Sequence, residues 1–161
     1  MISYTEAELE YLIHCPKEIS VPPKHTDSYD RGHYRNNMEL QSVDGQHFFS
    51  VFMRRHDFFT ENFSIGLRYH PTSTPGSFIL VRFNGPHEHI DGLDNFDSHH
   101  YGYHIHKANQ ESLDKGKRAE VYAELTTEYS NYNDALLYFL RYCNISGNHE
   151  YFTRLRQGSL F

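Results

Sequence analysis

The sequence predicts an α+β fold, an antiparallel β-meander of about five strands with an N-terminal helix and two or more C-terminal helices packed on one face. Three observations predict it. Apolar and polar residues alternate through 33–107, as in strands that bury one face. Helical spacing of apolar residues precedes this region in 1–14 and follows it in 110–161. The length fits a single domain over 1–161, in which we interpret 15–32 as a linker.

The N-terminal helix is predicted by its cap, its apolar stripe and its end. Ser3 or Thr5 caps it, and the glutamates that follow suit its positive N-terminal end. Pro16 ends it, because proline has no N–H to donate and clashes with the preceding turn. The apolar stripe consists of Ala7, Leu9, Leu12 and Ile13. Three prolines among polar residues indicate that 15–32 is a linker.

The central region divides into five expected strands. They cover 34–43, 46–55, 62–70, 77–84 and 101–107. Asp44 and Gly45 stand between the first two, and this pair is a strong signal for a tight hairpin. The turn before the fourth strand contains Pro75 and Gly76, and a loop rich in Gly, Asp and His spans 85–100. The short connections between the first four strands predict antiparallel neighbours.

The C-terminal part has helical composition. We expect one helix over 117–128 and a second that begins at Asn131 or Asn133. The second helix has apolar residues at i, i+4 and i+7, and Gly147 provides its stop. These apolar residues are Leu136, Leu140 and Cys143. The tail over 151–161 is expected to be a short helix or a packed extension.

Composition limits the class of protein. The hydrophobic share of 38% is low for a globular protein, but aromatic residues make up 16% of the chain and can supply much of the buried area of a core. A formal net charge of −6 argues against a protein that coats nucleic acid generally, although it leaves room for a local basic patch. Cys15 and Cys143 are too few for a disulfide framework, and neither a signal peptide nor a membrane-spanning stretch is recognised. We therefore expect a cytoplasmic protein without a membrane partner.

Strand parity sorts the side chains onto two faces of the sheet, because successive residues of a strand point to opposite sides. The expected core face consists of Phe49, Val51, Met53, Phe63, Ile65, Leu67, Ile79, Val81, Phe83, Tyr103 and Ile105. The opposite face receives Arg54, Ser64, Arg68, Arg82, Asn84, His104 and His106, with the parity of Phe48, Phe52, Phe78 and Leu80. If the hairpins close at the predicted turns, one row across neighbouring strands contains Arg54, Ser64, Arg82 and His104.

This polar face has two interpretations. In the first it is an ordinary solvated face, on which Arg and His pair with Glu or Asp. In the second it binds a phosphate or carboxylate, because arginines placed side by side repel each other and a bound anion offsets the repulsion with bidentate hydrogen bonds. The anion-binding residues would then be Arg54, Arg68, Arg82, Ser64 and Asn84.

The 13 histidines suggest a metal site as one kind of chemistry. His87 and His89 stand two residues apart, as do His104 and His106, and on a strand this spacing puts both imidazoles on one face. These four residues are the candidate ligands of a divalent metal. No cysteine or matched carboxylate completes a known zinc spacing, so the metal is an alternative rather than a requirement.

Acid–base catalysis is the other kind of chemistry, and it needs no cofactor. A histidine beside arginines has a lowered pKa and can serve as a base near neutral pH, while the arginines stabilise developing negative charge. These are the components of a metal-independent, RNase-like cleavage of a phosphodiester. The candidate catalytic residues are His104, His106, His87, Arg82 and Arg54.

Four runs of residues resemble an uncharacterised family of small bacterial and phage proteins. The runs are YRNNM (34–38), SVDGQH (42–47), ENFSIGL (61–67) and RFNGPH (82–87), and the similarity covers about 31–145. The last run, followed by His104 and His106, is distantly similar to a small toxin family of bacterial toxin–antitoxin modules, although Asn84 stands where that pattern has Asp. The first resemblance implies no assigned activity. The second implies action on RNA and an antitoxin-like partner protein.

The sequence leaves three functions open. The first is a toxin-like protein that acts on RNA or another phosphate-bearing ligand through the Arg/His face. The second is a module that binds a metal or a small anion without catalysis. The third is a protein–protein interaction domain, or a homodimer, that uses exposed strand edges and aromatic residues.

Overall fold

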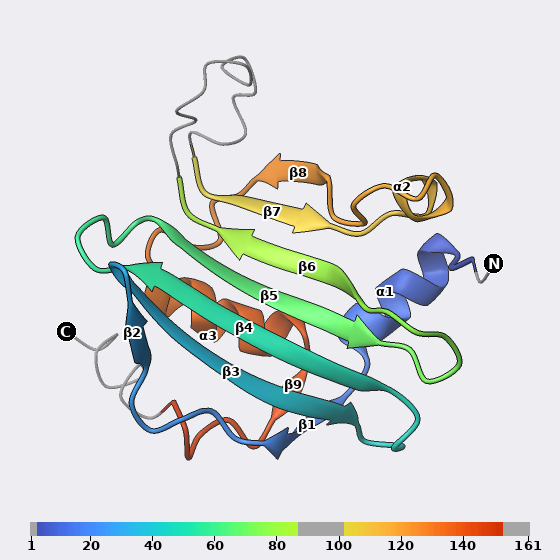
Figure 1. Ribbon diagram of the computed structural model, residues 1–161, viewed down its shortest axis with the longest axis horizontal. Helices are drawn as coiled ribbons and strands as arrows, with labels where there is room; N and C mark the ends of the chain where they lie inside the picture. The colour runs from blue at the N-terminus through green and yellow to red at the C-terminus, as the bar shows by residue number, and fades with distance from the viewer. Residues whose placement is uncertain (1–2, 87–101, 153–161) are drawn as a thin grey trace.

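The protein is built on one large, mainly antiparallel β-sheet (Figure 1). The computed structural model describes residues 3–86 and 102–152. Within that part of the chain there are nine strands: β1 (Lys17–Val21), β2 (Ser28–Asp30), β3 (His33–Ser42), β4 (Phe48–His56), β5 (Phe63–His70), β6 (Phe78–Asn84), β7 (His104–Lys107), β8 (Tyr122–Leu125) and β9 (Ile145–Ser146). The helices described with them are α1 (Glu6–His14), α2 (Gln110–Asp114) and α3 (Tyr132–Tyr142). The strand order is β8-β7-β6-β5-β4-β3-β1-β9, and β2 also pairs with β3.

The five expected strands are confirmed as β3 to β7, which follow one another as antiparallel neighbours. The hairpin at Asp44 and Gly45 sets the β3–β4 register. The Gly45 N–H donates to the Ser42 carbonyl at 2.8 Å, and Gly45 has a φ of 75°, which glycine adopts without steric cost. Because this turn closes where the sequence predicts, Met38 faces Val51 and the core parity of both strands follows.

Residues 15–32, which we expected to be a linker, instead contain β1 and β2. Both strands pair with β3, so they fill hydrogen bonds that its edge would otherwise expose. The prolines lie outside the strands, since Pro16 precedes β1 and Pro22 and Pro23 separate β1 from β2. A proline-rich segment can therefore contribute edge strands when its prolines fall in the connections.

The prediction of a helix over 117–128 is wrong. Helix α2 lies earlier in the chain, with Asn109 as its cap, and β8 forms within the predicted helix and pairs with β7. The segment has few large apolar residues to form a helical stripe, whereas pairing satisfies its backbone directly. The predicted short helix or packed extension over 151–161 lies outside the described residues from 153 onward.

Helices α1 and α3 lie on the same side of the sheet (Figure 1), which we call the inner face; the opposite side is the outer face. Thr5 caps α1, accepting from the Glu8 N–H at 3.1 Å, and Asn131 caps α3, accepting from the Asp134 N–H at 2.8 Å. Their buried residues join the sheet in one core: Leu9, Leu12, Ile13, Ala135, Leu136, Phe139 and Leu140. None of the helices in the described part of the chain is long and apolar enough to cross a membrane.

A β-bulge in β6 changes the expected core set. Leu67 faces Val81 while Arg68 faces Ile79, so Leu80 is an extra residue between the two pairs. Leu80 is fully buried in the core, and the Phe78 ring packs 5.8 Å from the Tyr69 ring. Ile79 shares the side of Arg68. The parity prediction was therefore wrong for Phe78, Ile79 and Leu80, because a bulge inverts the alternation beyond it.

Candidate functional site

The outer face carries two neighbouring rows of paired residues across the central strands. The first, which we call the arginine row, runs from β3 to β7 through Arg35, Arg54, Ser64, Asn84 and His104. The second runs from β4 to β7 through Phe52, Gly66, Arg82 and His106. Residues in neighbouring rows are two apart on each strand, so both rows face the same side.

The row expected from the sequence is correct for Arg54, Ser64 and His104 but wrong for Arg82. Ser64 faces Asn84, and Arg82 stands in the second row, between Gly66 and His106. The β5–β6 connection and the bulge together shift this pairing by two residues. A two-residue shift keeps Arg82 on the outer face, next to the arginine row rather than in it.

Arg35 and Arg54 face each other directly across β3 and β4. Both are exposed, and no carboxylate of the described residues forms an ion pair with either one. Partial burial lowers the pKa of Arg54, and the charge of Arg35 lowers it further. Two arginines are thus neighbours on the sheet, and no carboxylate in the described part of the chain neutralises them.

Arg82 is more deeply placed, with a side chain that is 15% exposed. Its guanidinium lies 3.7 Å from the carboxylate of Glu120, which also accepts from Arg118 Nε at 2.5 Å. Burial, followed by the charge of Arg118, lowers the pKa of Arg82 to about 10. Arg82 Nε is buried and has no hydrogen-bond partner among the described residues. The Glu120 carboxylate therefore interacts with two arginines, and Arg82 Nε is a buried donor without an acceptor among the described residues.

Of the other predicted anion-binding residues, Ser64 and Asn84 lie in the arginine row and Arg68 does not. Ser64 Oγ donates to Asn84 Oδ1 at 3.1 Å, and both residues are buried, so they form a neutral polar floor beside Arg54. Arg68 lies two rows away, opposite Ser50, and its guanidinium donates to the hydroxyl of a serine in the following loop at 3.2 Å. The structure does not bring Arg68 to the arginine row.

The predicted histidines are brought together in part. His104 and His106 are buried side by side, with ring centroids 5.0 Å apart. His104 Nδ1 donates to the Gly102 carbonyl at 2.8 Å and His106 Nδ1 to the Glu120 carbonyl at 3.0 Å, which fixes both ring orientations. His87 and His89 lie outside the described residues. Within the described ranges no group of three or more His, Cys, Asp or Glu is arranged to hold a metal ion.

The outer face continues beyond Arg35 and Arg54 into a histidine pair that sequence reasoning missed. His33 faces His56, and their rings are perpendicular with centroids 5.1 Å apart. Burial, Arg54 and the other nearby cations lower the pKa of His33. The hairpin itself is a signal that could have found Arg35 and His33. A register in which Ser42 and His47 flank the turn places these two residues opposite Arg54 and His56.

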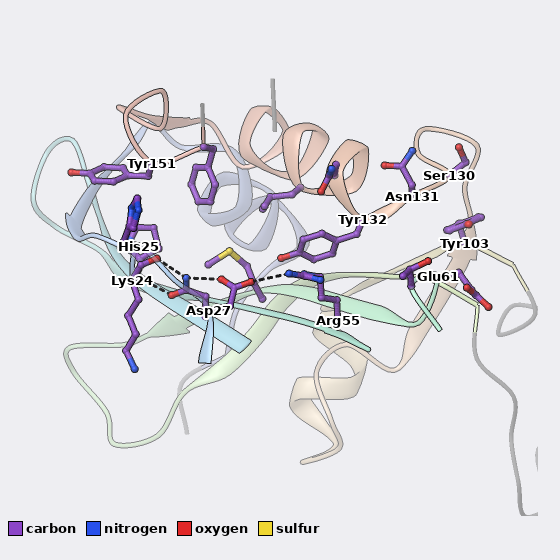
Figure 2. Close-up of a pocket in the computed structure, with 17 residues that line it drawn as sticks. Lys24, His25, Asp27, Arg55, Glu61, Tyr103, Ser130, Asn131, Tyr132 and Tyr151 are labelled. Atoms are coloured by element: carbon purple, nitrogen blue, oxygen red, sulfur yellow. Dashed lines mark hydrogen bonds and ion pairs between the residues drawn. The ribbon is translucent and has the colours of Figure 1, made fainter. Parts of the chain in front are cut away.

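A pocket of about 650 Å³ lies on the inner face, between the start of α3 and the ends of β3 and β4 (Figure 2). Arg55 is held there over the Tyr34 ring at 4.2 Å, and its guanidinium reaches Asp27 at 3.4 Å. Asn36 donates to the other Asp27 oxygen at 3.0 Å, and Tyr132 closes the pocket from α3. The volume is in the range of small-molecule sites.

The charges that line this pocket largely balance. Arg55 and Asp27 neutralise each other, and Lys24 and Glu61 add one charge of each sign at its rim. The pocket therefore selects no sign of ligand charge, in contrast to the outer face, where Arg35 and Arg54 have no ion-pair partner among the described residues. The outer face is the stronger candidate for a functional site, and none of the residues that line the pocket was among the site residues predicted from the sequence.

Comparison with known proteins identifies the family to which the chain belongs. Searches of the curated proteins and of the solved structures find no match. A family model described as a family of unknown function matches residues 4–145, which include both helix caps and the whole arginine row. The chain therefore belongs to DUF6978, a family of unknown function.

Proposed function

We propose that the outer face binds a phosphate-bearing ligand, with Arg35 and Arg54 as its principal contacts. One observation carries the proposal, namely that these two residues are directly opposite each other on β3 and β4 and no described carboxylate pairs with them. Like charges directly opposite in a sheet are destabilising, with Cβ atoms about 4.5–5.5 Å apart. A phosphate between them would replace this repulsion with charge-assisted, bidentate hydrogen bonds.

Arg82 supports the proposal from the second row. Its buried Nε lacks an acceptor in the described part of the chain, and the charge of Arg54 contributes to lowering its pKa. A ligand that spans both rows would therefore meet three arginines and the polar floor of Ser64 and Asn84. RNA, with phosphates repeated along its backbone, is such a ligand, and a nucleotide or inorganic phosphate offers the same chemistry at one point.

RNase-like cleavage and a toxin role remain predictions within this proposal. The fixed rings of His104 and His106 suit acid–base chemistry, but both side chains are buried. In the arginine row, Ser64 and Asn84 stand between Arg54 and His104. Binding is therefore the function that the geometry supports best. Metal binding also remains a prediction, since two of its four ligands lie outside the described residues.

Fluorescence anisotropy with a short labelled RNA tests the proposal, with ATP and inorganic tripolyphosphate as competitors. We expect Arg54→Ala and Arg35→Ala each to weaken RNA binding about tenfold or more, because a hydrogen bond to a charged group contributes about 1.5–3 kcal/mol. Arg141→Ala is the matched control, because it removes one exposed arginine from α3 on the other side of the sheet. Displacement by the small competitors would show that a short phosphate chain is sufficient for binding, and their failure to compete would show an extended RNA site.

The proposal is wrong if the wild type binds none of the three probes, or if Arg35→Ala and Arg54→Ala bind as tightly as Arg141→Ala. Gel analysis of the RNA after incubation separates binding from cleavage. Loss of cleavage in His104→Ala with binding retained would support the catalytic prediction, and intact RNA with the wild type would exclude it for that substrate.

A further inference from the structure

Two large aromatic side chains are exposed to solvent beyond the end of β4. Phe58 is 84% exposed and Phe59 is 61% exposed, both in the loop that joins β4 to β5. A chain gains nothing in stability from leaving adjacent phenylalanines unpacked, and such exposed apolar surface typically marks a binding site. Phe58 lies four residues after Arg54 in the sequence.

The loop presents these rings on a defined backbone. His56 Nδ1 accepts from the N–H groups of Phe58 and Phe59, each at 3.1 Å, so this nitrogen is the unprotonated one of its ring. The Phe59 carbonyl accepts from the Asn62 N–H at 2.8 Å, and the His56 N–H donates to the Asn62 carbonyl at 2.9 Å. A loop closed in this way holds its aromatic residues in place before a ligand arrives, which lowers the entropy cost of binding.

The aromatic rings connect directly to the arginines. The Phe59 ring lies 5.2 Å from the His56 ring, which lies 5.1 Å from the His33 ring. His33 and His56 form the pair next to Arg35 and Arg54 on the same face. The order along the surface is therefore aromatic, imidazole, guanidinium. The Asp57 carboxylate lies 3.4 Å from His56 Nδ1, and no described carboxylate forms an ion pair with Arg35 or Arg54.

We propose that Phe58 and Phe59 form a base-stacking platform for single-stranded nucleic acid, whose phosphates lie on Arg35 and Arg54. This inference rests on the proposed function and names its ligand class. Proteins that bind single strands combine a positive track for the backbone with exposed rings on which bases stack. In a duplex the bases already stack on one another, so their faces are not available to these rings. Single-stranded RNA or DNA is the class that fits, and a 2′-hydroxyl contact would separate the two.

The test compares labelled oligouridine, its deoxy counterpart, a duplex RNA and inorganic tripolyphosphate on the same variants. We expect Phe58→Ala and Phe59→Ala to weaken single-strand binding by roughly 5- to 100-fold each. Binding of tripolyphosphate should be unchanged, because it has no base. Phe48→Ala is the matched control, since Phe48 is 42% exposed on the outer face at the opposite end of β4. All these changes are at exposed positions, and thermal unfolding should confirm intact folding.

The absence of tryptophan from the chain provides a second measurement. Phe59→Trp places a single indole on the platform, and its fluorescence should be quenched when oligouridine binds but not when tripolyphosphate binds. Phe59→Trp should also retain the affinity that Phe59→Ala loses.

The outcomes separate the two proposals. If tripolyphosphate binding depends on Arg35 and Arg54 but both phenylalanine variants bind single strands like Phe48→Ala, the anion site stands and the platform is wrong. Equal affinity for duplex and single strand likewise overturns the platform. If neither nucleic acid nor tripolyphosphate binds the wild type, the proposed function fails and this inference fails with it.

Discussion

At the scale of single residues, Lys17 joins the two helices of the inner face. It is fully buried, and its ammonium group donates to the carbonyls of Ile13 at 2.7 Å, Cys15 at 2.9 Å and Cys143 at 2.9 Å. These carbonyls belong to the C-terminal ends of α1 and α3, where backbone acceptors lack helical partners and the helix dipoles are negative. One side chain thus satisfies both helix ends.

Replacing Lys17 with Met should lower the free energy of unfolding by about 3–5 kcal/mol, because three buried carbonyls lose their donor. Urea denaturation followed by circular dichroism measures the change. Lys24→Met is the control, since Lys24 is exposed. A loss no larger than that of the control would mean that water replaces the ammonium group at these carbonyls.

A second residue-scale effect is acid sensitivity at His33. Burial and the charge of Arg54 lower its folded-state pKa, so the unfolded chain binds this proton at a higher pH than the folded protein does. Its effect is absent above the ordinary histidine pKa of about 6.5, and stability is lost as the pH falls from there toward the folded pKa. His33→Gln should therefore flatten the fall in stability between about pH 7.5 and 5, measured by urea denaturation. The control His25→Gln, at an exposed position, should keep the wild-type slope.

Residue-scale prediction from the sequence succeeded where strand parity alone decides. Parity placed Arg54, Ser64, Asn84 and His104 on one face correctly, because side chains alternate in any regular strand. It did not identify Glu120, whose position depends on β8 and its pairing with β7 rather than on local pattern. Nor did it join Arg35 to Arg54, although the predicted hairpin contained that pairing.

At the scale of elements, the central meander was predictable and the edge strands were not. Strands β3 to β7 alternate apolar and polar residues, and recognisable turns join β3 to β6, so local pattern predicts most of this meander. Strands β1, β2 and β8 pair with backbone groups that the edges of that meander would otherwise leave unpaired. This pairing depends on the tertiary structure, so the local sequence pattern does not predict it. The bulge at Leu80 was also not predictable, since the local alternation of apolar and polar residues gives no sign of it.

The β4–β5 pair contains a close fit between Phe52 and Gly66. A Cβ added at Gly66 would meet the end of the Phe52 ring at 2.2 Å, so the ring lies across the glycine on the outer face. Gly66→Ala should cost about 1–3 kcal/mol of stability by displacing that ring. The cost should shrink in a Phe52→Ala background, where the space is vacant. Urea unfolding of the two single variants and the double variant measures this coupling, and additive losses would contradict the contact.

At the scale of the whole molecule, the net charge is −6, but the charged side chains are unevenly distributed over the surface. Glu6, Glu8 and Glu10 lie on α1, on the inner side of the sheet, while Arg35, Arg54 and the other outer-face arginines lie opposite. Glu39 also lies on the outer face and Glu10 of α1 pairs with Lys107, so the asymmetry is local: the opposed Arg35 and Arg54 form a positive patch that attracts an anionic ligand. This is how an acidic protein can still present a local site for phosphate, and composition alone could not reveal it.

Salt dependence distinguishes the two parts of the proposed surface. For single strands the logarithm of the binding constant falls with the logarithm of salt concentration, with a slope of about −0.7 for each phosphate neutralised. Replacing both Arg35 and Arg54 with Ala should therefore make the slope shallower by about 1.4. Phe59→Ala should lower affinity at every salt concentration and leave the slope unchanged, because stacking releases no counterions. Anisotropy titrations of oligouridine across a salt series measure both. A slope that the double arginine variant does not alter would show that these guanidinium groups contact no phosphate, whatever their effect on affinity.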